Sequence, residues 1–350
     1  MKTRLVRIDE QHIDMNLIKE AGDVIRAGGL VAFPTETVYG LGGDALNPSS
    51  SEKIYRAKGR PSDNPLIIHI ADMEALDRIV REIPESAVKL AKRFWPGPLT
   101  MILHKSDSVP YETTGGLDTV AVRMPVNRTA QELIRAAGGY VAAPSANLSG
   151  RPSPTSAKYV VQDMDGRIDM IIDGGDVEIG LESTIVDLTV GEPTVLRPGY
   201  ITKQMLEQVL TAVEEDSTMM RDDSGQAPKA PGMKYRHYAP KGDLTVVYGE
   251  TESVIAYIND HVESLRHDNK ITGVITTDEN AARYCADVCK SAGDRQDEET
   301  IARELYRILR EFDDEKVDII FAEAFDVSGI GQSIMNRLLK AAGHKVVHVS

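Results

Sequence analysis

Cysteine and long apolar runs are scarce in this sequence. The 350 residues include only two cysteines, Cys285 and Cys289, which lie four positions apart with no histidine at metal-ligand spacing. We interpret them as reduced packing residues of a cytoplasmic protein, and not as a disulfide or a zinc site. No apolar run approaches the ~18 residues of a membrane helix, and residues 1–10 lack the apolar core of a signal peptide. The sequence therefore predicts neither export nor a membrane span.

An excess of positive charge is also missing. The formal net charge is −14 and the pI is near 5.1, whereas a dedicated nucleic-acid binder usually presents a basic face. We expect no extended nucleic-acid surface, so any basic site must be local. The sequence also has no Walker A loop and no G-x-G-x-x-G after a strand. A nucleotide would have to be held without either of these glycine-rich phosphate loops.

The composition that is present predicts two globular domains joined by a linker. Hydrophobic residues make up 41% and charged residues 27% of the chain, which is ordinary for a folded protein, and 350 residues exceed the usual size of one core. Residues 214–242 are charged and rich in Pro and Gly, which predicts a linker between domains at 1–213 and 243–350. The aromatic and basic run Tyr235-Arg236-His237-Tyr238 within it is more than a spacer needs. The run either acts as a lid over a bound nucleotide or packs between the two domains.

A rigid cationic turn lies between a helix and a strand at residues 57–69. Ser49 and Glu52 form a capping-box pattern for the helix that runs to Lys58. Pro61 and Pro65 restrict the turn that follows, so Lys58 and Arg60 should be held in fixed positions beside Asn64. Such fixed donors suit a phosphate-bearing ligand. The alternative is a solvated turn whose cations stabilise the negative end of the helix dipole.

Several polar residues follow or end apolar strands. Arg123 ends the strand Thr119–Arg123 and needs an anionic partner, either a buried carboxylate of the chain or the carboxylate of a substrate. His69 in the strand Leu66–Ile70 is a core residue or a ligand. Thr35 and Ser145 belong to loops rich in hydroxyl groups, which can fold around a ligand. Thr155 either caps the next helix or donates to a phosphate.

Helices and strands alternate at first and a run of strands follows, which predicts a mixed, twisted sheet with flanking helices. From Leu244 onwards the pattern predicts a smaller, Rossmann-like parallel α/β domain that includes a helix at Glu279–Lys290. The triplet Gly329-Ile330-Gly331 is a weak nucleotide-loop pattern.

Eight motifs in order between Phe33 and Pro240 resemble those of a known family: FPTETVYGLGGDA, KGRPSDNPLIIH, FWPGPLT, VAVRMP, APSANLSG, ESTIVD, LRPG and PGMKYRHYAP. With them the sequence resembles the two-domain form of the Sua5/YwlC branch of the YrdC family, the threonylcarbamoyl-AMP synthases. The resemblance implies a YrdC-like catalytic domain and a Sua5-type second domain. It also implies synthesis of L-threonylcarbamoyl-AMP from L-threonine, bicarbonate and ATP with release of pyrophosphate, the first step of the N6-threonylcarbamoyladenosine modification of tRNA.

The resemblance also implies the residues of the site, without a covalent catalytic residue. L-Threonine would be held by Thr35, His69, Arg123, Ser145 and Ser183. ATP would be held by Lys58, Arg60, Asn64, Asn147, Thr155, Arg197, Tyr235 and His237. Mg²⁺ would come with ATP, and the motifs assign it no ligands. The partner that takes the product would be the threonylcarbamoyl-transferase machinery acting on tRNA. An RNA-binding module and an ATP- or threonine-sensing regulator without chemistry are the alternatives.

Overall fold

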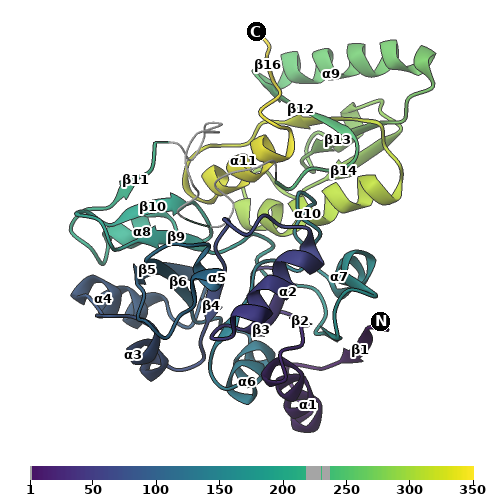
Figure 1. Ribbon diagram of the computed structural model, residues 1–350. Coiled ribbons are helices and arrows are strands. Elements are labelled where there is room, and N and C mark those ends of the chain that lie inside the picture. Colours follow the sequence, from purple (N-terminus) through teal and green to yellow (C-terminus); the bar gives the residue numbers. More distant parts are fainter. Residues whose placement is uncertain (1, 218–229, 231–236) are drawn as a thin grey trace. The chain divides into compact units, whose positions relative to one another are not determined.

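The computed structural model describes residues 2–217, 230 and 237–350 (Figure 1). The chain forms two compact units. The first consists of Met1–Ser149 and Ser153–Tyr235, and the second of Gly150–Pro152 and Arg236–Ser350. Within the described ranges, no helix combines the length and apolar character of a membrane span.

The first unit is built on a mixed sheet, as predicted. Its strands lie in the order β1-β8-β2-β3-β7-β4-β6-β5-β9-β10-β11. Strands β4 and β6 run parallel, whereas β5 is antiparallel to β6. The strand bounds are β1 Arg4–Arg7, β2 Val31–Phe33, β3 Gly40–Asp44, β4 Ile67–His69, β5 Leu99–His104, β6 Thr119–Arg123, β7 Val141–Ala142, β8 Met170–Asp173, β9 Thr184–Asp187, β10 Thr194–Arg197 and β11 Glu214–Glu215.

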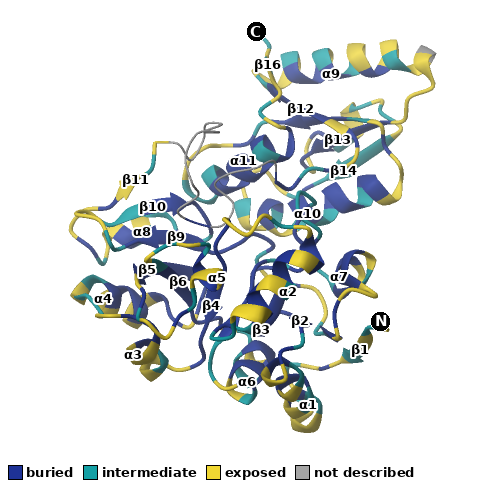
Figure 2. Ribbon diagram, viewed as in Figure 1, coloured by how far each residue is buried: buried dark blue, intermediate teal, exposed yellow. Residues whose placement is uncertain are grey.

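Helices cover the two faces of this sheet unequally. The larger core lies on one face, under α2, α4, α7 and α8. On the other face, α1 and α6 cover β2, β7 and β8, and each of these helices turns a buried side to the sheet (Figure 2). The helices are α1 Met15–Arg26, α2 Pro48–Lys58, α3 Leu76–Ile79, α4 Glu85–Phe94, α5 Tyr111–Thr114, α6 Arg128–Ala136, α7 Ala157–Met164 and α8 Lys203–Glu207, with the 3₁₀ turn η1 Met73–Ala75.

The second face carries a smaller apolar cluster where α1 and α6 do not reach. Strand residues Ile67, Ala121 and Ile185 belong to it, together with Ile102 and Leu196. Ala230, from the segment predicted to be a linker, is fully buried in the same cluster. No helix of the described chain takes part in this cluster. A residue of the predicted linker thus packs on the part of this face that α1 and α6 leave uncovered.

The basic turn follows a helix that begins two residues earlier than the capping-box pattern predicts, at Pro48. Asn47 caps α2 by accepting a hydrogen bond from the amide of Ser49, and Pro48 occupies the first helical position. The capping-box prediction for Ser49 and Glu52 is therefore wrong, because an Asn-Pro pair already supplies the cap and the preset φ. The helix ends as expected, at Gly59 with φ of 62°.

Glycine in β3 serves packing within the protein. A Cβ on Gly42 would lie 2.8 Å from a methyl carbon of Val141 and 2.9 Å from the Phe33 ring. Strand β3 is paired with β2 and β7, so these contacts join neighbouring strands. The glycines after the Thr35 loop therefore allow close approach of the protein's own side chains.

The second unit is a small parallel α/β sheet, as predicted. Its strand order is β14-β13-β15-β12-β16, and every pairing is parallel. The strands are β12 Asp243–Tyr248, β13 Thr272–Thr276, β14 Val288–Ser291, β15 Ile319–Glu323 and β16 Val346–His348. The helices are α9 Thr251–Leu265, α10 Glu298–Asp314 and α11 Gly329–Ala341, with 3₁₀ turns η2 Arg266–Asp268 and η3 Ala281–Arg283.

One helix prediction in this unit is wrong. The segment predicted to be helical at Glu279–Lys290 contains η3 and then enters β14, which pairs with β13. Cys289 therefore lies on a strand and Cys285 is exposed before it. A short segment takes its strand conformation from the backbone groups of a neighbouring strand, which local periodicity does not reveal.

Candidate active site

A row of polar side chains crosses three neighbouring strands of the first unit. His69 on β4 is in register with Arg123 on β6, and Arg123 is in register with Thr100 on β5. Because side chains alternate along a strand, these three project from the same face as Ile67, Ile102 and Ala121. That is the face on which Ala230 packs. The row and Ala230 therefore lie on the same face of the sheet.

Arg123 makes a buried ion pair at the centre of this row. Its Nη2 lies 2.7 Å from Oε1 of Glu36, and both side chains are about 95% or more buried. Its Nη1 donates a hydrogen bond of 2.8 Å to the hydroxyl of Thr37. The Thr37 hydroxyl is in turn 2.9 Å from that of Thr35. The chain of contacts thus joins the predicted threonine-binding residues Thr35 and Arg123.

His69 is neutral in this environment. Its ring is buried, and Nδ1 lies 3.1 Å from the carbonyl oxygen of Ile67. Burial, and secondarily the positive charge of Arg123, lower the pKa of the imidazole to about 3. A neutral ring can offer a hydrogen bond to a substrate but no charge.

The lowered pKa of His69 predicts a specific acid sensitivity of stability. Between the unfolded value near 6.5 and the folded value of about 3, only the unfolded chain binds the proton. Stability should therefore fall with decreasing pH by about 1.4 kcal/mol per unit in this window. We expect the advantage of wild type over His69→Gln to shrink by about 2 kcal/mol between about pH 7.5 and pH 5 in urea denaturation. An advantage independent of pH would contradict the buried, neutral assignment.

Lys58 organises the loop that contains Ser145 and Asn147. It lies at the end of α2, is buried, and its ammonium donates to the carbonyl oxygens of Ser145 and Asn147. The Ser145 hydroxyl donates to Oδ1 of Asn147 at 2.5 Å. The amide of Ser149 returns a hydrogen bond to the Lys58 carbonyl. Lys58 therefore holds Ser145 and Asn147 together, and all three residues are predicted to bind substrates.

Arg60 is tied into its own turn. Its guanidinium donates to Oδ1 of Asn64 at 2.6 Å and to the carbonyl oxygen of Pro65 at 3.0 Å. This places Arg60 beside Asn64, with the side chain half-buried. Arg60 is therefore more than a solvated turn residue, because its guanidinium also closes the turn through these hydrogen bonds.

A third group of predicted residues gathers at the start of β9. Arg197, at the end of β10, donates through Nε and Nη2 to the carbonyl oxygen of Ser183. The Ser183 hydroxyl lies 2.7 Å from that of Thr100, which links this group to the row containing Arg123. Thr155 is buried and lies two residues before α7. It does not cap this helix, because Ser156 holds the N-cap position. The helix-cap alternative for Thr155 is therefore wrong.

Of the two linker residues predicted to bind ATP, the structure describes only His237. Tyr235 lies outside the described residues. His237 belongs to the second unit, where it is buried with its ring 5.5 Å from that of Tyr238.

Sequence reasoning missed three residues of the site, namely Glu36, Thr37 and Thr100. Glu36 and Thr37 directly follow Thr35, so the signal was their place in the same polar run after β2. Thr100 lies inside an apolar strand, and only its register with Arg123 reveals it.

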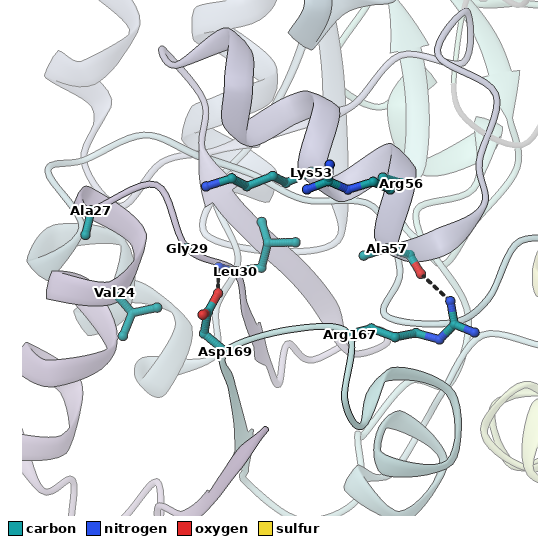
Figure 3. Close-up of a pocket in the computed structure, with 9 residues that line it drawn as sticks. All are labelled: Val24, Ala27, Gly29, Leu30, Lys53, Arg56, Ala57, Arg167 and Asp169. Atoms are coloured by element: carbon teal, nitrogen blue, oxygen red, sulfur yellow. Dashed lines mark hydrogen bonds between the residues drawn. The ribbon is translucent and has the colours of Figure 1, made fainter. Parts of the chain in front are cut away.

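A separate pocket of about 560 Å³ is lined in part by α2 and contains none of the predicted site residues (Figure 3). Lys53, Arg56 and Arg167 line it. The Lys53 ammonium donates to the Gly28 carbonyl just beyond α1, and Arg167 reaches the Ala57 carbonyl in the last turn of α2. Cations at helix carboxyl ends stabilise the helix dipole, so a structural role accounts for this arrangement.

Neither a metal cluster nor a phosphate loop stands out in the parts that are described. No group of three or more His, Cys, Asp or Glu side chains there could hold a metal ion. At the weak glycine pattern that begins α11, the carboxylate of Glu298 accepts a hydrogen bond of 3.0 Å from the Gly331 amide. A carboxylate thus occupies the helix end that a phosphate would need, which argues against a phosphate loop.

Comparison with known proteins agrees with this arrangement. The family of Sua5, YciO and YrdC proteins, described as "Telomere recombination", matches residues 23–199. The family described as "Threonylcarbamoyl-AMP synthase, C-terminal domain" matches residues 201–343. Threonylcarbamoyl-AMP synthase of Bacillus subtilis is 48% identical over 97% of this chain and 96% of its own length. The protein of the same name from Pyrococcus abyssi is 48% identical over 95% and 96%.

A solved structure extends the likeness to the whole chain. Pyrococcus abyssi Sua5 complexed with L-threonine superposes with a TM-score of 0.94 at 47% identity, covering 99% of this chain and 100% of that one. A family match over half of the chain and relatives this similar along their full length agree with the motifs read from the sequence. The chain therefore belongs to the Sua5/YrdC family.

Proposed function

We propose that this protein synthesises L-threonylcarbamoyl-AMP from L-threonine, bicarbonate and ATP, with release of pyrophosphate, as the first step of the N6-threonylcarbamoyladenosine modification of tRNA. The observation that carries the proposal is the buried fork of Arg123, set among the hydroxyls of the Thr35 loop. A guanidinium in such a site is matched to a carboxylate, the group common to all amino acids. Relatives with the same two domains are named threonylcarbamoyl-AMP synthases.

The predicted residues fall into two neighbouring sets. The threonine set comprises Thr35, His69, Arg123, Ser145 and Ser183, and the row on β4, β5 and β6 connects most of it. The ATP set includes Lys58, Arg60, Asn64, Asn147, Thr155 and Arg197. Contacts between Lys58 and the Ser145 loop, and between Ser183 and Arg197, join the two sets. Amino acid and nucleotide would therefore bind side by side.

The proposed reaction requires alignment more than covalent help. The amine of threonine attacks bicarbonate, and an oxygen of the resulting carbamate attacks the α-phosphate of ATP. Holding reactants in the correct geometry contributes several kcal/mol to catalysis, and fixed cations neutralise charge that develops on phosphate. No residue of the chain needs to become covalently modified.

Mg²⁺ would enter with ATP. The described residues offer no carboxylate cage for it, and Mg²⁺ is commonly held by substrate phosphates with water and few protein ligands. Its contribution, when bound, is to neutralise charge on the phosphates. We assign it no protein ligand.

The product is a reactive mixed anhydride, so we propose that downstream threonylcarbamoyl-transferase machinery receives it for tRNA modification. The burial of Ala230 on the face that carries Arg123 supports a covering role for the predicted linker. The full-length relatives named threonylcarbamoyl-AMP synthases favour the synthase over an RNA-binding module or a sensor without chemistry.

The decisive measurement is pyrophosphate release by the full chain with single substrates omitted. We expect release only when L-threonine, bicarbonate, ATP and Mg²⁺ are all present, with threonylcarbamoyl-AMP detected by mass spectrometry. Omission of threonine or bicarbonate should reduce the rate at least tenfold, since each supplies atoms to the product. Pyrophosphate release that ignores both compounds would reject the synthase, and binding without any release would favour the sensor.

A further inference from the structure

Glu36 is a buried carboxylate to which the proposed function assigns no binding role. Its side chain is 3% exposed and pairs with Arg123. Apart from this ion pair, neither of its carboxylate oxygens has a hydrogen-bond partner among the described residues. Burial of a charge with so few partners is costly and is seldom retained without a reason. The few contacts of Glu36 indicate that its carboxylate interacts with a further group when substrate is bound.

A threonine carboxylate and Glu36 compete for the same cation. Arg123 offers Nη1 to Thr37 and Nη2 to Glu36, while its Nε has no partner in the described chain. Bidentate binding of a substrate carboxylate uses two of these nitrogens. It would displace the Glu36 carboxylate from Arg123. The displaced group remains next to the site, because the Ile179 amide holds the backbone carbonyl of Glu36 at 2.9 Å.

The proposed reaction creates a need for such a group. At neutral pH threonine carries an ammonium group, whose nitrogen has no lone pair for attack. If a carboxylate accepts one proton, the free amine forms the C–N bond with bicarbonate. The C–OH bond then breaks, and the departing hydroxide takes the second N–H proton as water. Carbamate and water are the products, and the first proton stays on the carboxylate until solvent removes it.

We propose that Glu36 is this proton acceptor, and that the carboxylate of the bound threonine exposes it by taking over Arg123. The inference rests on the proposed function. The ammonium and carboxylate of threonine share one carbon, and Glu36 lies 2.7 Å from Arg123, so a carboxylate bound at Arg123 would leave the ammonium in the neighbourhood of Glu36. A buried carboxylate that has lost its cationic partner takes up a proton readily, because burial disfavours its charged form.

Other charged groups around Glu36 suit this role less well. His69 on β4 has a pKa lowered to about 3 by burial, so it is a weak base. Arg123 on β6 is a cation. Asp176 and Glu178, on the loop that bonds the Glu36 backbone, are both exposed. Glu36 is thus the buried carboxylate that pairs with Arg123.

The test compares Glu36→Gln with wild type across pH. We expect the variant to bind L-threonine at least as tightly in calorimetric titration, because its neutral amide competes less for Arg123. Product formation at about pH 7 should fall about a hundredfold, a usual effect of removing a general base. The deficit should shrink at least tenfold as pH rises above about 9, because the ammonium of free threonine loses its proton without help about one unit above a peptide N-terminus.

Two further variants make the result specific. Glu36→Asp keeps a carboxylate and should lose less activity than Glu36→Gln, with a pH profile like that of wild type. It also serves if Glu36→Gln does not fold. Glu182→Gln removes a different buried carboxylate, which accepts from Ser153. Any loss it causes should not diminish at high pH.

Three outcomes would overturn the proposal: wild-type rates for Glu36→Gln at about pH 7, a deficit that stays constant as pH rises, or loss of threonine binding in that variant. The last would mean that Glu36 holds the substrate. Failure of the proposed function itself would show differently, because wild type would then form no product from the three substrates.

Discussion

Replacing Arg123 by methionine is expected to weaken L-threonine binding about a thousandfold and to change ATP binding less than about threefold. The substitution removes the fork that we assign to the threonine carboxylate and leaves the repelling carboxylate of Glu36 in place. Arg123→Lys should give a smaller but still selective loss, since an ammonium cannot make a bidentate contact. Calorimetric titration with each substrate separately measures both effects. Equal weakening of threonine and ATP would contradict the assignment.

The same substitution should also destabilise the protein, and a double variant separates the two effects. Loss of Arg123 leaves Glu36 buried without its cation, which costs about 3 to 5 kcal/mol. In Glu36→Gln/Arg123→Met no buried charge is left unpaired by the change, so most of that stability should return in urea denaturation. Threonine binding should remain lost. Recovery of threonine binding in the double variant would show that Arg123 acts only through the fold.

Replacing Lys58 by methionine is expected to lower product formation about a thousandfold. Its ammonium donates to the carbonyl oxygens of Ser145 and Asn147, and each buried acceptor left without a donor costs about 1 to 3 kcal/mol. The loop carries a residue from the threonine set and another from the ATP set. We therefore expect the KM for both substrates to rise, together with a fall in kcat.

Lys53→Met on the same helix is the matched control. Lys53 donates to the Gly28 carbonyl and lines the separate pocket (Figure 3). It should cost stability of no more than about 1 kcal/mol and leave steady-state kinetics unchanged. If Lys58→Met raises only the KM for ATP, the ammonium contacts the triphosphate directly and its bonds to the loop are secondary.

The stability of the site rests on pairings that combine distant parts of the chain. Glu36, in the loop after β2, pairs with Arg123 at the end of β6, and Lys58 bonds to the loop at residues 145–147. Interactions of this kind are coupled, so the single variants above should not be additive. The double variant of Arg123 and Glu36 is informative for that reason.

The sequence by itself determined the mixed sheet, the parallel second domain, and most of the polar residues that gather on the first sheet. Hydrophobic periodicity, prolines and glycines are local, and they located β6 and the end of α2 closely. It also showed that Arg123 needed an anion, while leaving open which one.

Only the tertiary structure showed that Glu36 pairs with Arg123, that Lys58 bonds to the Ser145 loop, and that residues 288–291 form a strand. Each depends on a partner far along the chain or on strand register. Asn47, and not Ser49, caps α2. Both residues are good helix caps, and the sequence pattern did not show which of them is preferred. The physical reason is common to the first three: a side chain's charge and shape state what it needs, but folding selects which distant group supplies it.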